Sequence, residues 1–145
     1  MKRKILLLVL VVLLILSLTG CKIFPPFCPE SMRAGQKVYS YWQAIINREY
    51  ELAKWYCVFD GVWYNKVDEW EEYINTNSEG EALVLIYLYP FSKKIEVIGD
   101  NAIVYATVSV HKMDIPGNFV IYVDIFEYEI ELLKQNYPPG DWELK

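Results

Sequence analysis

The sequence predicts an α+β domain in which N-terminal helices pack on one face of a curved antiparallel sheet. Up to about residue 74, apolar residues recur at spacings of three or four, which is typical of amphipathic helices. From about residue 81 the spacing becomes two, and β-branched and aromatic residues dominate, which is typical of strands. A helical half followed by a strand half indicates the α+β class.

The chain begins with a segment typical of an export signal. Lys2, Arg3 and Lys4 precede an unbroken apolar run from Ile5 to Leu16, and this order matches the charged and apolar regions of a secretory signal. The run is shorter than the ~20 apolar residues that a permanent bilayer span needs. An uncleaved single-pass anchor is the alternative. Both interpretations place the rest of the chain outside the cytoplasm.

The tetrapeptide Leu18-Thr19-Gly20-Cys21 follows this run and resembles the lipobox of bacterial lipoproteins. The resemblance implies cleavage before Cys21, lipid attached to Cys21, and anchoring at the cell membrane. Several acyl chains suffice for stable anchoring, whereas one gives marginal binding. We therefore expect a signal peptide at 1–20, a lipidated cysteine with a proline-rich tether at 21–30, and a single domain at 31–145.

Charge excludes two kinds of partner. Removal of residues 1–20 leaves 125 of the 145 residues, and because the three charges removed are all basic, the formal charge falls from −5 to −8. A chain this acidic is a poor candidate for nucleic acid, whose phosphates need clustered Lys and Arg. It would also not adhere to anionic lipid by charge, so the predicted membrane contact is the lipid anchor.

Cys28 and Cys57 are an even pair once Cys21 carries lipid. Disulfides persist outside the cytoplasm, so a bridge between the two is one of two interpretations. Such a bridge would close a loop of about 30 residues and stabilise the fold by roughly 3 to 4 kcal/mol in the chain-entropy account. Two separate thiols, one in the tether and one in the core, are the alternative.

Three helical segments are expected in the first half of the domain. The first extends from Ser31, as its N-cap, to about Asn47, which tolerates the left-handed conformation of a C-terminal cap. A shorter segment covers Glu49 to Tyr56, and Asp60-Gly61 marks the turn after it. The third, Lys66 to Ile74, has one apolar face formed by Val67, Trp70 and Ile74. Its acids at 68, 69, 71 and 72 are expected to face solvent, with metal binding as the alternative.

The second half is expected to form an antiparallel meander. Ala82 to Tyr89 is predicted to be a buried strand, and residues 94–98 and 102–113 flank the tight-turn sequence Gly99-Asp100-Asn101. A long strand covers 119 to about 133, and a short one closes the chain at 142–145. One face of the long strand changes from apolar at 121, 123 and 125 to acidic at 127, 129 and 131. Either a bulge near Phe126 resets the phase, or that face leaves its cover halfway along.

Four segments of the domain carry a family resemblance: Val38 to Ile46, the helix break and restart from Asn47 to Ala53, the hairpin from Ile95 to Val104, and the terminal Gly140 to Leu144. In these segments the chain resembles members of the nuclear-transport-factor-2-like superfamily, whose fold is a cystatin-like α+β cone. The resemblance is to the lipoprotein branch of this superfamily, in which the domain follows a lipobox. The resemblance implies a cone with a cavity between helices and sheet. Members use this cavity for ligands, for partners and in a few cases for catalysis.

Aromatic residues are the strongest chemical signal, since Tyr, Trp and Phe make up 16% of the chain. Such side chains suit pockets and interfaces as well as cores. The functional interpretation places Tyr39, Trp42, Trp63 and Trp70 at the cavity mouth, stacked on an envelope glycan or on another lipophilic or aromatic compound. The alternative is that they fill the core of a small cone.

Asp124 is the candidate acid or base. Strict alternation places it on the face of Tyr122 and Phe126, where it could point into an aromatic cavity, as does the Asp base of ketosteroid-isomerase-like members. A partly exposed strand carboxylate is the alternative. His111, the single histidine, is expected at the surface and gives no metal-ligand spacing.

These observations favour a lipid-anchored, non-catalytic binding or interaction module facing outside the cytoplasm. Its expected partners are the membrane, through the lipid, and a small ligand or an envelope protein. One alternative is a structural envelope component that forms homodimers through its sheet, and another is a small-molecule enzyme using Asp124. No cofactor and no metal are predicted.

Overall fold

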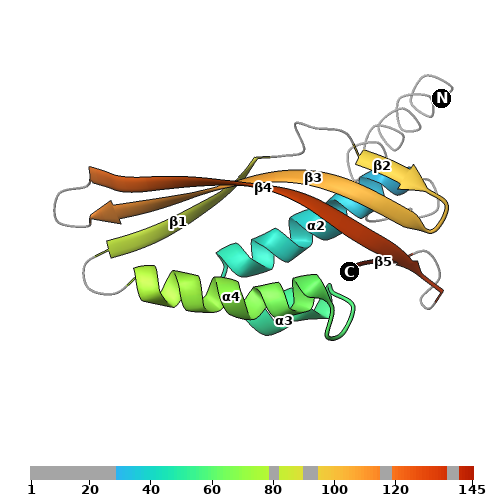
Figure 1. Cartoon of the computed structure of the whole chain (residues 1–145), viewed down its shortest axis with the longest axis horizontal. Coiled ribbons are helices and arrows are strands. Elements are labelled where there is room, and N and C mark those ends of the chain that lie inside the picture. Colours follow the sequence, from blue (N-terminus) through green and yellow to red (C-terminus); the bar gives the residue numbers. More distant parts are fainter. Residues whose placement is uncertain (1–28, 79–81, 90–94, 115–118, 137–140) are drawn as a thin grey trace, which may run out of the picture.

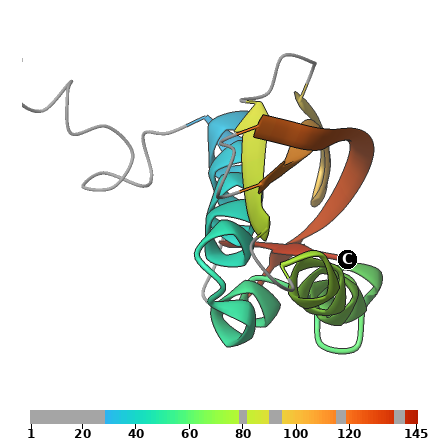
Figure 2. The same cartoon turned by 90° about the vertical axis from the view of Figure 1, so that its left-hand side faces the viewer.

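A computed structural model describes residues 29–78, 82–89, 95–114, 119–136 and 141–145. The described part is an α+β structure in which three helices pack against a strongly curled antiparallel sheet, so the predicted class is confirmed (Figures 1 and 2). The helices are α2 (Glu30–Ile46), α3 (Tyr50–Trp55) and α4 (Val62–Asn77). The strands are β1 (Ala82–Tyr89), β2 (Ile95–Ile98), β3 (Asn101–Asp114), β4 (Phe119–Gln135) and β5 (Asp141–Leu144).

Residues 1–28 lie outside the described residues. They include the predicted signal peptide, the lipidation site Cys21 and the disulfide candidate Cys28, which remain predictions. Among the described residues, no helix has the length and apolar character needed to cross a membrane. Helix α2 begins at Glu30, one residue before the predicted start of the domain.

The long strands β3 and β4 form the centre of the sheet. The order is β1-β3-β4-β5, and β2 pairs with the stretch of β3 that β1 leaves uncovered. The hairpin of β2 and β3 closes at Ile98 opposite Asn101, and Gly99 has the left-handed φ of 61° that this turn requires. One face of β3 is buried in the core and consists of Ala102, Val104, Ala106, Val108 and Val110.

Strand β1 differs from its prediction as a buried strand. It lies at the edge of the sheet, and one of its faces is open to solvent, where Leu83 and Tyr87 are exposed. Val84 and Ile86 alternate with these residues and face the core. An unbroken apolar run does not distinguish a strand covered on both faces from one covered on a single face.

Strand β4 follows neither of the two alternatives predicted for it. Its register with β3 shifts between Lys112 and Met113, near its first residues, and stays regular through Phe126. From Val123 to Glu131, every second residue is exposed on the outer face of the sheet. That face therefore carries exposed apolar residues at one end, including Ile125, and acidic residues at the other.

The first helix is capped differently from the prediction. Pro29 occupies the N-cap position without a side-chain hydrogen bond, so Ser31 lies inside the helix. At the other end Asn47 keeps a right-handed conformation, and the next residue, Arg48, has the left-handed φ of 63°. The amide of Glu49 donates to the carbonyl of Ala44 at 2.8 Å and closes the helix end. The left-handed residue is thus at C′, the position where helix ends commonly adopt it.

Helix α4 begins four residues before the predicted Lys66. Gly61 is its N-cap, and a Cβ at this position would lie 2.9 Å from the carbonyl oxygen of Val58. The close approach explains why glycine is needed before the helix starts. The predicted apolar face is confirmed, because Val67, Trp70 and Ile74 are buried.

One continuous core joins the three helices to the sheet. Buried residues of α2, α3 and α4 pack with buried residues of β1, β3, β4 and β5. The largest fully buried side chains are Trp42, Trp142 and Tyr41. The inner face of the curled sheet is thus filled by aromatic side chains, and a hollow lies between α4 and β4.

Candidate functional site

A surface cavity of about 270 Å³ lies between α4 and the inner face of β4. We call it the aromatic pocket. Its lining consists of Lys66, Glu69, Trp70 and Tyr73 from α4, and Asp124, Phe126 and Tyr128 from β4.

Two sequence periods bring these side chains together. Residues 66, 69, 70 and 73 are spaced at three, four and seven along α4, so they lie on one face of the helix. Residues 124, 126 and 128 alternate along β4 and share its inner face. The pocket is thus built from rigid elements rather than from loops, which fixes the positions of its side chains.

Aromatic rings form the walls of the aromatic pocket. Phe126 and Tyr128 are nearly parallel, with 6.1 Å between ring centroids and 11° between planes. Trp70 stands almost perpendicular to Phe126, at 5.5 Å and 81°, and Tyr73 does the same at 6.4 Å and 88°. Ring planes therefore bound the cavity from two directions.

The charged groups of the aromatic pocket are one lysine and two carboxylates. Lys66 Nζ lies 2.5 Å from Glu69 Oε2 on α4. Asp124 is half-buried on β4. The pocket therefore combines an apolar wall with a net negative charge.

The two tyrosines of the pocket have altered acidities. Burial, with smaller contributions from Glu69 and Tyr73, raises the pKa of Tyr128 to about 12. Burial raises the pKa of Tyr73, and the negative charge of Asp124 raises it further. Both phenols are therefore neutral at physiological pH and sit in a negative electrostatic environment.

The structure brings together two of the five predicted site residues. Trp70 and Asp124 both line the aromatic pocket, although Trp70 is only 4% exposed. Trp42 and Trp63 are not at a cavity mouth but are buried in the core. Their rings lie 5.6 Å and 5.3 Å from that of Tyr128, so they support the wall of the pocket from behind. Both belong to the helix faces that the curled sheet covers, which is why they are core residues.

Tyr39 lies apart from the other candidates. It is exposed on α2 and lines a separate surface hollow with Met32, Gln36 and Ile95. The structure therefore does not place Tyr39 with Trp42 at one cavity mouth, because Tyr39 is exposed to solvent whereas Trp42 is fully buried in the core.

His111 and Asp124 face opposite sides of the sheet. His111 pairs with Val123 in the β3–β4 register and lies on the outer face, where its Nε2 is 3.2 Å from Ser109 Oγ. Asp124 pairs with Val110, which faces the core. The two groups cannot act together on one ligand.

Several pocket residues were not singled out from the sequence, namely Lys66, Glu69, Tyr73, Phe126 and Tyr128. A signal for them exists. The helical spacing of Lys66, Trp70 and Tyr73 matches that of one helix face, and Phe126 and Tyr128 continue the alternation from Asp124. The sequence does not show that these two faces meet, because that depends on the curl of the sheet.

A second hollow, of about 510 Å³, lies beside β5. We call it the β5 groove. It is lined by Lys37, Glu51, Lys54, Trp55, Cys57, Phe59, Tyr64, Asp141 and Glu143.

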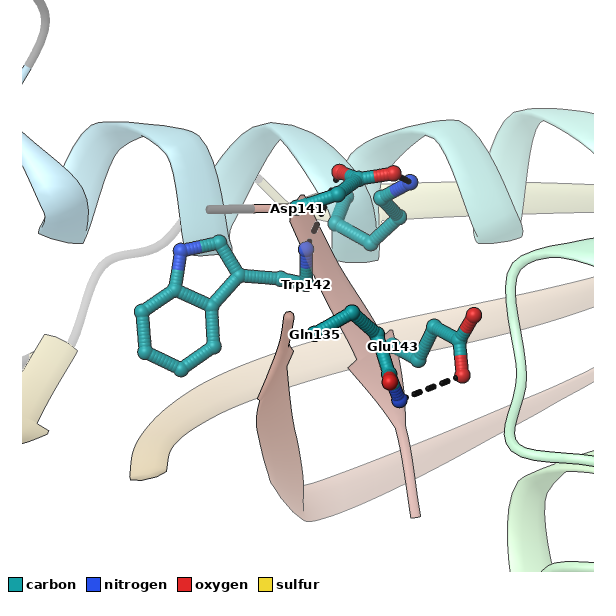
Figure 3. A network of polar contacts seen from close by, with 5 residues as sticks. Gln135, Asp141, Trp142 and Glu143 are labelled. Atoms are coloured by element: carbon teal, nitrogen blue, oxygen red, sulfur yellow. Dashed lines mark hydrogen bonds and ion pairs between the residues drawn. The ribbon is translucent and has the colours of Figure 1, made fainter. Parts of the chain in front are cut away.

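Polar contacts at the β5 groove tie the last strand to the rest of the fold (Figure 3). Asp141 accepts from the amide of Trp142 at 2.9 Å and pairs with Lys37 of α2 at 3.0 Å. Gln135 of β4 donates to Glu143 at 2.8 Å. These contacts hold the strand ends in place, and they account for the charges of this part of the groove.

The aromatic residues of the β5 groove are strongly exposed. Trp55 is 73% exposed and Phe59 is 81% exposed. Trp55 ends the short helix α3, and Phe59 lies in the turn that leads to α4. They are less firmly positioned than the rings of the aromatic pocket, which is therefore the better candidate for holding a small ligand.

Cys57 also borders the β5 groove, but it is buried. Its Sγ donates to the carbonyl of Ala53 at 3.5 Å. Burial, aided by the charge of Glu143, raises the pKa of the Cys57 thiol to about 12. Because Cys28 lies outside the described residues, the bridge between the two stays a prediction.

Within the described ranges, no group of three or more His, Cys, Asp or Glu side chains is arranged to hold a metal ion. The acids of α4 are placed apart. Asp68 pairs with Lys54 at 2.7 Å, whereas Glu69 pairs with Lys66.

Comparison of the chain with protein-family models, with curated proteins and with solved structures finds no match. The function of the chain must therefore be inferred from the chemistry of its own residues.

Proposed function

We propose that this chain is a lipid-anchored, non-catalytic binding module that faces outside the cytoplasm and holds a small ligand in the aromatic pocket. The signal-like segment and the lipobox-like Leu18-Thr19-Gly20-Cys21 support the location. The three helices packed on a curled antiparallel sheet support an assignment to the nuclear-transport-factor-2-like cones.

The observation that carries the proposal is one surface cavity lined by four aromatic rings and a half-buried carboxylate. Ligand sites are typically concave and apolar, with a few polar groups that fix orientation. Drug-sized ligands occupy pockets of roughly 300 to 1,000 Å³. At about 270 Å³, the aromatic pocket suits a smaller molecule.

An enzyme using Asp124 is the less favoured alternative. A base needs a second group that stabilises the developing charge, and the neutral phenols of Tyr73 and Tyr128 are the available donors. The small volume disfavours a multi-ring substrate of the ketosteroid type. We therefore propose binding without turnover.

Native mass spectrometry of the protein in the form extracted from the envelope of its own host, in an uncharged detergent, tests the proposal. A reproducible small adduct that is released on unfolding is the expected result. Tyr73→Ala removes one half-buried wall of the pocket and should abolish the adduct. Tyr105→Ala is the matched control, because Tyr105 is also half-buried but lies on the outer face of β3. A bare mass for the unchanged chain would contradict the proposal.

One observation favours homodimerisation as a second function. The outer face of the sheet exposes apolar side chains from β1 and β4, which we call the outer apolar patch: Leu83, Tyr87, Val120, Val123 and Ile125. The register of the sheet brings these residues together across β3. Ser109 of β3 lies between Tyr87 of β1 and Ile125 of β4, and His111 lies between Leu85 of β1 and Val123 of β4. Ile125 is 65% exposed. Contiguous exposed apolar surface is a mark of an interaction site.

The same mass spectra test this second function. A mass of two chains is expected, and Ile125→Glu should return it to one chain. Glu129→Gln on the same face of β4 is the control and should leave the mass unchanged. A single-chain mass for the unchanged protein at all concentrations would contradict dimerisation.

A further inference from the structure

We propose that the aromatic pocket selects a compact organic cation, of the alkylated ammonium class, over a neutral molecule of the same shape. This inference rests on the proposed function, because it specifies the ligand of the same cavity.

The ring geometry supplies the first part of the argument. Cations bind to the faces of Trp, Tyr and Phe within ~6 Å of the ring centroid. In the aromatic pocket, the Trp70 and Tyr73 rings lie 5.5 Å apart, and both stand nearly perpendicular to Phe126. Trp70 is only 4% exposed, whereas Tyr73, Phe126 and Tyr128 are half-buried, so a ligand in the cavity contacts mainly these three rings. Tyr73 on one wall stands nearly perpendicular to Phe126 on the other, and Tyr128 is nearly parallel to Phe126, so ring surfaces approach a ligand from two directions, which suits a compact cation.

The charges supply the second part. The lining holds two carboxylates, Asp124 on β4 and Glu69 on α4, and one lysine, so its net formal charge is −1 and favours a cation. The single lysine of the lining, Lys66, is paired with Glu69 at 2.5 Å, so its charge is largely balanced. The raised pKa of Tyr73 and that of Tyr128 agree with this, since Asp124 and Glu69 contribute to them.

Size and overall charge supply the third part. A volume of about 270 Å³ accommodates an alkylated ammonium group with a short substituent. An anion of the same size would be repelled by the net negative charge of the lining. The chain also has a formal charge of −5, which attracts cations from solution. A neutral ligand would gain the apolar contacts of the pocket but neither electrostatic contribution.

Isothermal titration calorimetry of the full chain in an uncharged maltoside detergent tests the inference. The probes are choline and 3,3-dimethylbutan-1-ol, which has the same shape with carbon in place of the charged nitrogen. We expect choline to bind about ten-fold more tightly than the neutral probe. Asp124→Asn should remove most of this preference while leaving the affinity for the neutral probe unchanged. Glu129→Gln, on the outer face of the same strand, should preserve the preference.

A second pair of variants tests the rings without changing charge. Tyr73→Leu should weaken choline binding about five-fold, whereas Tyr73→Phe keeps the ring and should bind as the unchanged chain does. Far-UV circular dichroism of each variant confirms that the fold is intact.

The outcomes separate the inference from the proposed function. Equal affinity for both probes, or tighter binding of the neutral one, would overturn the inference and support the proposed small-ligand site. A choline preference that survives Asp124→Asn and Tyr73→Leu would place binding elsewhere and overturn the inference. Binding of neither probe at millimolar concentration would overturn it as well, and an adduct-free native mass would then refute the proposed function separately.

Discussion

Replacement of Trp42 by alanine tests the assignment of this residue to the core rather than to a ligand surface. The Trp42 side chain is fully buried. Its ring lies 5.3 Å from Trp70, 5.4 Å from Tyr41 and 5.6 Å from Tyr128. Trp42→Ala therefore removes the ring at the centre of the aromatic core and leaves a large cavity.

The expected cost follows from this burial. Truncation of a buried Trp to Ala typically lowers the free energy of unfolding by ~3 to 5 kcal/mol, and the loss of ring pairs worth ~0.5 to 1.5 kcal/mol each favours the upper end. A domain of this size has a total stability of roughly 5 to 15 kcal/mol. The substitution thus removes a large share of it.

Urea denaturation followed by far-UV circular dichroism measures the change. With a slope of ~2 kcal/mol per molar urea, the midpoint should fall by about 2 M. Trp55→Ala is the matched control, because Trp55 is 73% exposed and its replacement should change the stability by less than ~0.5 kcal/mol. A loss below ~1 kcal/mol for Trp42→Ala, or equal losses for the two variants, would refute the placement of Trp42.

Three further predictions concern single residues. In a Cys28→Ser variant, Cys57 should react with a disulfide reagent at pH 8 roughly a thousand-fold more slowly than in the unfolded chain, because its pKa of about 12 leaves little thiolate. Peptide mass spectrometry measures the reaction rate. Equal rates for the folded and unfolded chains would contradict the burial of Cys57. Arg48 has a left-handed φ of 63°, which glycine adopts at lower cost than arginine, so Arg48→Gly should raise the free energy of unfolding measured in urea by ~0.5 to 1 kcal/mol. A loss of stability would contradict this prediction and show that the arginine side chain is needed. Burial raises the pKa of Tyr128 from its ordinary value of 10.0 to about 12, so the stability that its neutral form contributes is complete below pH 10 and is lost as the pH rises to 12. Tyr128→Phe should lessen this loss of stability in urea titrations, and an unchanged pH profile would contradict the prediction.

The sequence predicts the elements of this fold well because their signals are local. The β2–β3 hairpin depends on the tight-turn residues around Gly99 and on the alternation that starts at Ala102, and both lie within the segment itself. The apolar face of α4 is equally local, since Val67, Trp70 and Ile74 recur at helical spacing.

Features that depend on distant contacts could not be predicted in the same way. The exposure of β1 arises from its place at the sheet edge, and the burial of Trp42 arises from the curl of the sheet over α2. The aromatic pocket depends both on local sequence patterns and on contacts between distant segments. Alternation placed Asp124 beside Phe126, but the meeting of this face with Tyr73 is set by the packing of α4 on β4.

The most direct test of the proposed site is the ¹⁵N–¹H spectrum of the tryptophan indoles. The chain has five Trp residues, and Trp70 alone among those in the described ranges lines the aromatic pocket, whereas Trp55 lines the β5 groove. Trp70→Phe and Trp55→Phe assign the two signals. Addition of choline or 3,3-dimethylbutan-1-ol to the full chain should shift the Trp70 signal and leave the Trp55 signal in place. A shift confined to Trp55 would contradict the aromatic pocket as the binding site, and no shift with either probe would contradict the inferred preference for an organic cation.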